Sequence, residues 1–217
     1  MAKKEYYSDD IVVTYDVKRC IHAAECIRGL PAVFDTKKRP WIQPDQAQAN
    51  DVAEVIMRCP SGALHFERRD GGGDETIPTK NTIHIDPNGA LYVQGNIEIM
   101  TSDGDLLLED TRVALCRCGA SENKPFCDNN HLQIGFQTSG ELGENWLAQD
   151  EIEDGDGKLK ITVAKNGPLL LEGQVEIFNA DGTSSCTGSK GDLCRCGGSS
   201  NKPFCDNTHK RIGFEAA

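Results

Sequence analysis

The chain has 217 residues and a formal net charge of −11 at pH 7, and only 6% of its residues are aromatic. This length indicates one to three small domains, and the low aromatic content favours small modules stabilised by metals over one large core. The acidic balance argues against binding to nucleic acid or to anionic membrane surfaces, and it suits an electron carrier that docks on basic partners.

The N-terminus has no apolar core of the kind found in signal peptides. No apolar stretch approaches the roughly 18 residues of a membrane-spanning helix. We therefore expect a cytoplasmic protein with no membrane partner. The chain contains ten cysteines, and in a reducing compartment these indicate metal binding rather than disulfides.

Residues 1–69 are predicted to form a compact α+β domain. Short apolar runs lie near its two ends, and Val52, Val55, Ile56 and Cys59 recur with helical spacing. The expected elements are a strand at 11–15, a cysteine-bearing loop and short helix at 20–29, a brief strand at 41–42, a helix at 46–58 and a closing strand at 63–66.

This first domain contains a ferredoxin-like set of three cysteines, Cys20, Cys26 and Cys59. A ferredoxin's first group reads C-x2-C-x2-C, and a remote Cys-Pro supplies the fourth ligand. Here Ala23 occupies the middle position, so three thiolates remain and favour a [3Fe–4S] cluster. A [4Fe–4S] cluster would need His22 or a small ligand at its fourth iron, and we expect His22 to be a polar neighbour instead.

The same segment resembles the divergent single-cluster ferredoxin domains over about residues 10–68. The resemblance is carried by residues 28–35, 39–42 and 59–64. It implies a small ferredoxin-like fold around one iron–sulfur cluster.

Residues 70–80 are rich in Gly and are predicted to be a linker. Two homologous repeats follow, repeat 1 at 81–137 and repeat 2 at 158–217, with a constant offset of 78 residues. Asn-Gly and Asp-Gly pairs between apolar runs predict hairpin turns. Each repeat should therefore contain about three short strands, a cysteine loop and a short helix.

The connecting segment, 138–157, is acidic and is expected to be a solvated linker. Its charge leaves open the alternative of a docking surface for a basic partner.

Each repeat ends in three cysteines and one histidine with the spacing C-x-C-x8-C-x3-H. These residues are Cys116, Cys118, Cys127 and His131 in repeat 1, and Cys194, Cys196, Cys205 and His209 in repeat 2. Thiolates with imidazole suit iron–sulfur clusters or zinc rather than Mg or Ca. The last cysteine and the histidine are four residues apart, which predicts one helical face beginning near Pro125 and Asp128.

This motif, with its Ser121, Pro125 and Asp128 and their counterparts in repeat 2, resembles the CDGSH iron–sulfur domain family, which includes mitoNEET. The resemblance implies a [2Fe–2S] cluster on each set of four ligands. It also implies that the tandem pair forms an intramolecular pseudo-dimer with a shared β-cap, in an α+β chain. The family's Gly-Ser pair is replaced by Asn129-Asn130 and Asn207-Thr208, and Asn tolerates the unusual backbone angles of Gly.

A histidine ligand in place of a fourth cysteine has two consequences. The oxidised cluster carries one less negative charge, so its potential should lie between those of plant-type ferredoxins and Rieske centres. A proton can also compete with iron for the imidazole, so His131 and His209 should be the labile ligands. The main alternative for the site is tetrahedral zinc, and a further one is that the metals only stabilise two small domains.

The other cysteine, histidine, arginine and lysine side chains of interest are not expected to bind metal. Cys186 aligns with Leu108 and should be a small buried thiol, and His65 and His84 should be structural. Arg117 and Arg195, between the paired cysteines, should offset the charge of the metal centres, and Lys124 and Lys202 either do the same or are surface residues.

We therefore expect a monomeric electron-transfer protein with two [2Fe–2S] clusters and one [3Fe–4S] or [4Fe–4S] cluster. Its partners would be a reductase or an electron acceptor. The alternative is a carrier or redox and pH sensor that donates [2Fe–2S] to apo-proteins. No nucleophile–base set or nucleotide-binding motif indicates an enzyme.

Overall fold

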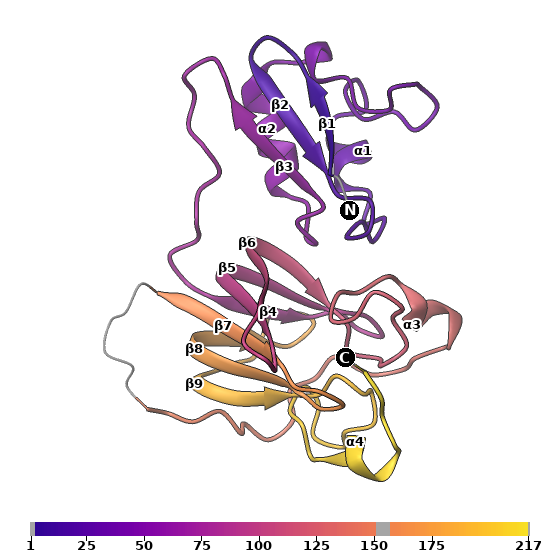
Figure 1. The fold of residues 1–217 in the computed structure, drawn as a ribbon, viewed down its shortest axis with the longest axis vertical. Helices are drawn as coiled ribbons and strands as arrows, with labels where there is room; N and C mark the ends of the chain where they lie inside the picture. The colour runs from indigo at the N-terminus through magenta and orange to yellow at the C-terminus, as the bar shows by residue number, and fades with distance from the viewer. Residues whose placement is uncertain (1–2, 151–156, 217) are drawn as a thin grey trace. The chain divides into compact units, whose positions relative to one another are not determined.

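The computed structural model describes residues 3–150 and 157–216. The chain divides into two compact units, Met1–Thr76 and Ile77–Ala217, which can be followed in Figure 1. Both combine strands with short helices, so the chain is α+β and mostly β.

Unit 1 is a three-stranded antiparallel sheet in the order β1-β2-β3. The strands are β1 (Lys4–Tyr7), β2 (Ile11–Tyr15) and β3 (Leu64–Arg68), and the helices are α1 (Glu25–Gly29), η1 (Pro44–Gln46) and α2 (Ala49–Met57). Val52 and Ile56 of α2 are buried in one core with Ile11 and Val13 of the sheet. The helical spacing of α2 thus provides the apolar face that covers the sheet.

The predicted elements of unit 1 are confirmed with shifted ends, except for the strand expected at 41–42. The strand at 11–15 is β2, but α2 begins at Ala49 because Pro44–Gln46 forms a separate 3-10 turn. Only Ile42 of the expected strand at 41–42 pairs, in an isolated bridge with Phe34. Strand β1 was not predicted, because its mostly exposed residues show no apolar alternation.

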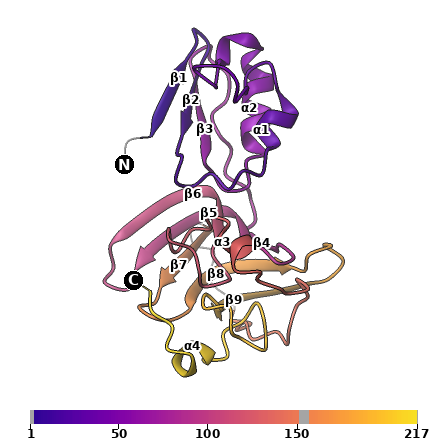
Figure 2. The same cartoon turned by 90° about the vertical axis from the view of Figure 1, so that its right-hand side faces the viewer.

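Unit 2 contains both repeats, and each supplies three strands and one short helix (Figures 1 and 2). Repeat 1 forms β4 (Thr82–Ile85), β5 (Leu91–Thr101), β6 (Leu106–Leu115) and α3 (Asn130–Gln133). Repeat 2 forms β7 (Lys158–Val163), β8 (Leu169–Phe178), β9 (Ser185–Leu193) and α4 (Thr208–Arg211). The number of strands is as predicted, but the second and third strand of each repeat are long rather than short.

The first strand of each repeat pairs with strands of both repeats. Strand β4 is antiparallel to β5 and parallel to β8. In the same way, β7 is antiparallel to β8 and parallel to β5. The six strands therefore form one sheet in which the strands of the two repeats are intermixed.

A glycine bulge in β5 and another in β8 make this exchange of strand partners possible. The register of β5 shifts after Gln94 and that of β8 after Glu172, next to Gly95 (φ +148°) and Gly173 (φ +125°). A Cβ on Gly173 would lie 2.3 Å from Lys158 O, so a side chain is excluded there. On the edge away from β6 or β9, the half of each strand before the bulge pairs with the first strand of its own repeat, and the half after it pairs with the first strand of the other repeat.

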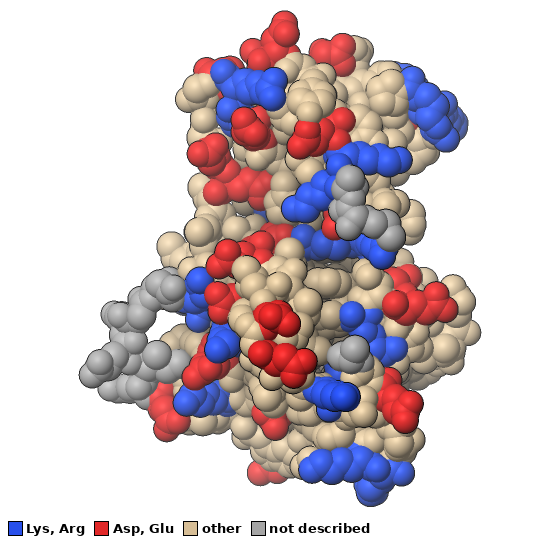
Figure 3. All heavy atoms as spheres, in the orientation of Figure 1, with Lys and Arg blue, Asp and Glu red and all other residues tan. Residues whose placement is uncertain are grey.

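Charged side chains of both signs are interspersed over the face of the molecule seen in Figure 3. The net charge of −11 therefore does not gather into one acidic surface on this face. Beside the cysteine loop of repeat 2, α4 instead exposes Lys210 and Arg211.

The exchanged strands share one core, and this generates a prediction for stability. Ile83 of β4 is 0% exposed and pairs with residues of both β5 and β8. We expect Ile83→Ala to lower the free energy of unfolding by about 2–5 kcal/mol, because it leaves a cavity between the repeats. Leu106→Ala, at a side chain that is 53% exposed, is the control and should change it by less than about 0.5 kcal/mol. Equal effects in urea unfolding would contradict a shared core.

Candidate metal centres

The ligand set predicted for repeat 1 comes together as two pairs at the end of β6. The Sγ atoms of Cys116 and Cys118 are 3.7 Å apart, and Cys127 Sγ lies 3.5 Å from His131 Nδ1. Two atoms bound at about 2.3 Å to one tetrahedral metal lie about 3.8 Å apart. Each pair therefore has the spacing of two ligands on one metal, and Nδ1 is the imidazole nitrogen that faces the site.

Repeat 2 reproduces this geometry. The Sγ atoms of Cys194 and Cys196 are 3.8 Å apart, and Cys205 Sγ lies 3.3 Å from His209 Nδ1. Both histidines and the first cysteine of each set are buried. In the described part of the chain no group of three or more His, Cys, Asp or Glu side chains is arranged to hold a single metal ion.

The predicted helical face for Cys127 and His131 is wrong. Helix α3 begins at Asn130, so Cys127 and Pro125 precede it. Asn129 has φ 69° and Asn207 has φ 64°, and a left-handed residue cannot continue an α-helix. The expectation that Asn replaces Gly at this backbone conformation is confirmed.

An aspartate closes each cysteine loop. Asp128 accepts hydrogen bonds from the backbone N–H of Glu122 (2.7 Å) and of Asn130 (3.0 Å). Asp206 accepts them from Ser200 and Thr208 in the same way, and these donors hold the pKa of the Asp206 carboxyl well below its usual range. The two ends of each loop are therefore tied through one carboxylate.

Backbone amides point at the sulfur atoms in both repeats. Cys118 Sγ accepts from the N–H of Ala120 (3.4 Å), and Cys127 Sγ accepts from that of Asn129 (3.5 Å). Burial raises the pKa of the Cys127 thiol to about 11, whereas the hydrogen bond between Cys116 and Cys118 lowers the pKa of Cys116 and raises that of Cys118. A positive metal core would offset the cost of burying these sulfur atoms as thiolates, so the donor set fits an iron–sulfur cluster.

The two cysteine loops touch each other. Cys118 and Cys196 form an isolated antiparallel bridge, and both following glycines have left-handed φ angles. A Cβ on Gly119 would lie 2.7 Å from Cys196 O, and one on Gly197 would lie 2.6 Å from Cys118 O. Only glycine permits this approach, so the two candidate centres are neighbours.

An arginine between the paired cysteines is buried in each repeat. Arg117 is 1% exposed and donates to Gly89 O (3.1 Å) and Asp86 O (2.6 Å). Its guanidinium lies 5.6 Å from the ring centroid of Phe136. Arg195 makes the equivalent contacts with Gly167 O, Ala164 O and Phe214.

These arginines lie in the electrostatic field of the other repeat. Burial lowers the pKa of Arg117 to about 10, and negative charge at Asp86 and at Cys194 of repeat 2 opposes this. Burial likewise lowers the pKa of Arg195, and Cys116 of repeat 1 opposes it. Nη1 of Arg117 is buried and has no hydrogen-bond partner among the described residues. A buried cation of this kind is stable beside an anionic group, and an oxidised cluster with three thiolates is one.

The lysines of the two loops serve as structural donors. Nζ of Lys124 donates to Ser121 O, and Nζ of Lys202 donates to Ser199 O. Each lysine therefore braces the loop that it belongs to.

In unit 1, Cys20, Cys26 and Cys59 line one recess together with His22 and Glu25. His22 (φ 54°) and Ala24 (φ 65°) are left-handed, which turns the loop around the recess. Burial raises the pKa of the Cys26 thiol to about 11. Three sulfur donors around an open recess fit a cluster with three cysteine ligands.

Sequence reasoning missed a buried arginine that is bonded to Ser61 in the lining of this recess. Arg19 is 4% exposed and donates to Ser61 O (2.7 Å), two residues beyond Cys59. An arginine is a surface residue by default, so nothing in the sequence singled it out.

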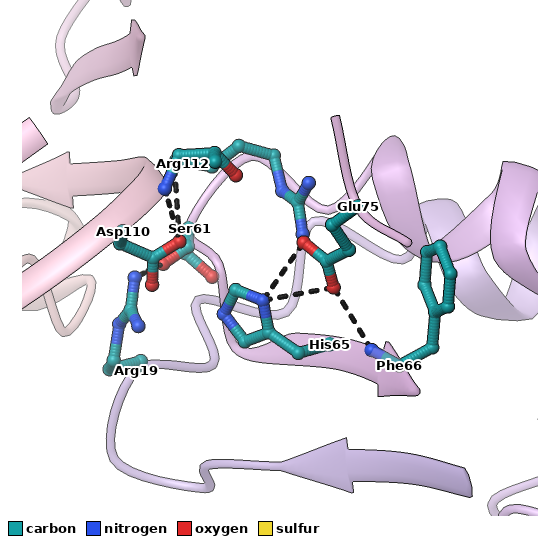
Figure 4. A network of polar contacts seen from close by, with 8 residues as sticks. Arg19, Ser61, His65, Phe66, Glu75, Asp110 and Arg112 are labelled. Atoms are coloured by element: carbon teal, nitrogen blue, oxygen red, sulfur yellow. Dashed lines mark hydrogen bonds and ion pairs between the residues drawn. The ribbon is translucent and has the colours of Figure 1, made fainter. Parts of the chain in front are cut away.

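The remaining reactive side chains have structural contacts. Nδ1 of His65 lies 3.0 Å from both carboxylate oxygens of Glu75, which also accepts from the N–H of Phe66 (2.9 Å; Figure 4). This network attaches the predicted linker to β3. His84 stacks on Phe178 with ring centroids 4.7 Å apart.

Cys186 is a partly buried thiol packed against the core of unit 2. It pairs with Ile177, whereas Leu108 pairs with Ile99. The expected correspondence between Cys186 and Leu108 is confirmed, and burial raises the pKa of its thiol.

Comparisons with known proteins agree with this division of the chain. The family described as "Divergent 4Fe-4S mono-cluster" matches residues 6–69. The family described as "Iron-binding zinc finger CDGSH type" matches residues 88–132 and 166–210. The uncharacterized protein YjdI of Escherichia coli, in strains K12 and O157:H7, is 38% identical over 64 residues, which cover 30% of this chain and 84% of YjdI. No solved structure matches the chain significantly.

The loop-closing aspartate generates a testable prediction. Outer residues that orient metal ligands typically contribute about 10–100-fold to metal affinity. We expect Asp128→Ala to weaken metal retention in repeat 1 by about that factor, because the loop then loses the bonds to Glu122 and Asn130. The measurement is the release of iron to a chelator. Glu122→Ala, which removes an exposed side chain but keeps the backbone donor, is the control. Equal release from the two variants would contradict this role.

Proposed function

Because the chain belongs to the CDGSH-type iron-binding family and carries a divergent 4Fe-4S mono-cluster domain at its N-terminus, we propose that it is a multi-cluster electron-transfer protein. Iron–sulfur clusters supply one-electron chemistry at potentials that the protein tunes. The observation that carries the proposal is the direct contact between the two cysteine loops of unit 2.

In this proposal each repeat binds one [2Fe–2S] cluster through three cysteines and one histidine. The pairing of the donor atoms supports two irons per site, with the first two cysteines on one iron and the last cysteine and the histidine on the other. The structure also supports a fused dimer, because the strand exchange relates repeat 1 to repeat 2 reciprocally. The tandem pair would then act as a monomer with pseudo-twofold symmetry and a shared β-cap.

The loop contact supports electron exchange between the two centres. Cys118 and Cys196 are both proposed ligands, and their backbones are paired. Neither loop carries a side chain at Gly119 or Gly197 that would separate them. The chain's own role is to hold the two ligand sets close together and to keep solvent away from the buried members of each set.

The recess of unit 1 is proposed to bind a third cluster through Cys20, Cys26 and Cys59. Three thiolates suit [3Fe–4S], whereas the family description names a 4Fe-4S cluster. The four-iron form requires one more ligand, and His22 lies in the lining of the recess.

A second candidate function is the donation of [2Fe–2S] to apo-proteins. The observation that favours it is the single histidine in each ligand set, since an imidazole is displaced by protons more easily than an iron-bound thiolate. Rapid reversible reduction with full retention of iron supports electron transfer. Delivery of clusters from the oxidised protein to an apo-ferredoxin supports donation.

Iron and sulfide analysis of the anaerobically purified chain tests the cluster content. We expect about seven irons per chain if the recess holds [3Fe–4S], or about eight if it holds [4Fe–4S]. Electron paramagnetic resonance of the oxidised and reduced protein separates these cases. A colourless protein containing zinc would refute the proposal.

The histidine ligands generate a second prediction. We expect His131→Cys to lower the reduction potential of the repeat 1 cluster by roughly 100 mV or more, because a fourth thiolate adds negative charge. His209→Cys is the matched variant and should lower the potential of the repeat 2 cluster more than that of the repeat 1 cluster. Redox titration followed by paramagnetic resonance measures both potentials. Unchanged potentials would show that these histidines do not bind the clusters.

A further inference from the structure

The segment between the repeats is attached to repeat 2. Residues 139–149, called the strap below, were expected to be solvated, yet Leu147 is 6% exposed and belongs to the core of unit 2. The strongly acidic part of the predicted linker, 151–156, lies outside the described residues. The strap is therefore a structural part of unit 2.

The strap is bonded to the ligand loop of repeat 2. The N–H of Gly143 donates to Lys202 O (2.8 Å), and the N–H of Glu144 donates to Asn201 Oδ1 (2.7 Å). In return, Asn201 Nδ2 donates to Glu144 O (2.9 Å). Asn201 and Lys202 lie between Cys196 and Cys205, so the strap holds the stretch that connects two proposed ligands.

The strap also pairs with strand β9. The N–H of Ala148 donates to Lys190 O (2.8 Å), and the N–H of Ser189 donates to Ala148 O (2.9 Å). Leu147 lies directly over two glycines of β9. A Cβ on Gly188 would be 2.4 Å from Leu147 Cβ, and one on Gly191 would be 2.5 Å from Leu147 Cδ2. Strand β9 thus provides the space that the strap requires.

Strand β6 of repeat 1 is built differently at the same positions. Asp110 and Val113 occupy the places of Gly188 and Gly191, 78 residues earlier. Asp110 Oδ1 accepts from the N–H of Thr111 (2.6 Å), the counterpart of the Ser189 N–H that bonds to the strap. Strand β6 therefore satisfies this amide with its own side chain, and it carries side chains at the two positions where β9 has only glycine.

We propose that the strap makes the two metal centres unequal, so that repeat 2 retains its cluster and repeat 1 is the site that exchanges with an apo-protein acceptor. This inference rests on the proposed [2Fe–2S] clusters. To release a cluster, Cys205 and His209 must move away from Cys194 and Cys196, and the strap opposes that movement in repeat 2.

The acceptor is a protein with free cysteine thiols. In the exchange, two irons and two sulfides move together without a change in oxidation state. Acceptor thiolates replace Cys116, Cys118, Cys127 and His131. The three released thiolates take up three of the acceptor's protons, and the fourth passes to His131 or to solvent.

Two single-site forms of the full chain test this inference. Cys127→Ser leaves the cluster of repeat 2, and Cys205→Ser leaves that of repeat 1. Each oxidised protein is mixed with apo-ferredoxin at neutral pH, and transfer is followed by circular dichroism. We expect transfer from repeat 1 to be at least about tenfold faster, since several hydrogen bonds hold the loop of repeat 2. Equal rates, or faster transfer from repeat 2, would overturn the inference.

Variants of the strap connect this difference to its cause. Both variants are made in the Cys127→Ser form, which keeps the cluster of repeat 2. Gly188→Asp places under the strap the residue that β6 has at position 110, and Leu147→Ala removes the buried anchor of the strap without a new clash. Both should raise the transfer rate of repeat 2 towards that of repeat 1, whereas Leu107→Ala on the exposed side of β6 should not. An unchanged rate in Leu147→Ala would refute the role of the strap.

Reversible reduction of both single-site proteins by dithionite is recorded in parallel. Forms that bind iron and sulfide and are reduced, but transfer at equal rates, refute this inference alone. Forms that bind no iron–sulfur cluster refute the proposed function on which it rests.

Discussion

The first strand of each repeat lies between strands of different repeats, and the arrangement of the metal-binding loops depends on this constraint. The exchange requires β5 and β8 to bend, which Gly95 and Gly173 permit because their φ angles are closed to most side chains. Once the sheet is shared, β6 and β9 end in related positions, and the loops that follow them meet at Cys118 and Cys196. Separate repeats would have no reason to place their cysteines side by side.

This closeness creates an electrostatic problem that the buried arginines address. Two anionic centres next to each other repel, and burial strengthens the repulsion. Arg117 and Arg195 each donate hydrogen bonds to backbone carbonyl groups, which hold a buried positive charge between the paired cysteines of each repeat. Each lies in the field of a cysteine from the other repeat. In the proposed form with both clusters bound, a change in the charge of one centre would act on an arginine that also adjoins the other centre.

The sequence predicted the candidate ligand sets, whose members lie in close pairs in the structure, and the number of strands in each repeat. Both predictions follow from local spacing and from an offset that is constant over the repeat. It did not reveal the parallel pairing of β4 with β8, because strand partners distant in sequence leave no mark on local periodicity. The i, i+4 spacing of Cys127 and His131 suggested a helix, but the left-handed Asn129 interrupts it. The strap was missed because its composition is that of a linker, and only Leu147 and the two glycines of β9 reveal it together.

The strap also shows how two homologous units in one chain can become different from each other. In a symmetric homodimer the same surface appears on both subunits, so any covering of one site is repeated on the other. A connecting segment in a single chain lies on one repeat and breaks this equivalence. Here the loss of equivalence is accompanied by differences between the corresponding strands. Strand β9 has Gly188 and Gly191 where β6 has Asp110 and Val113. Such paired changes are expected if the two sites have different tasks, because a connection without a role in repeat 2 would not require glycines beneath it.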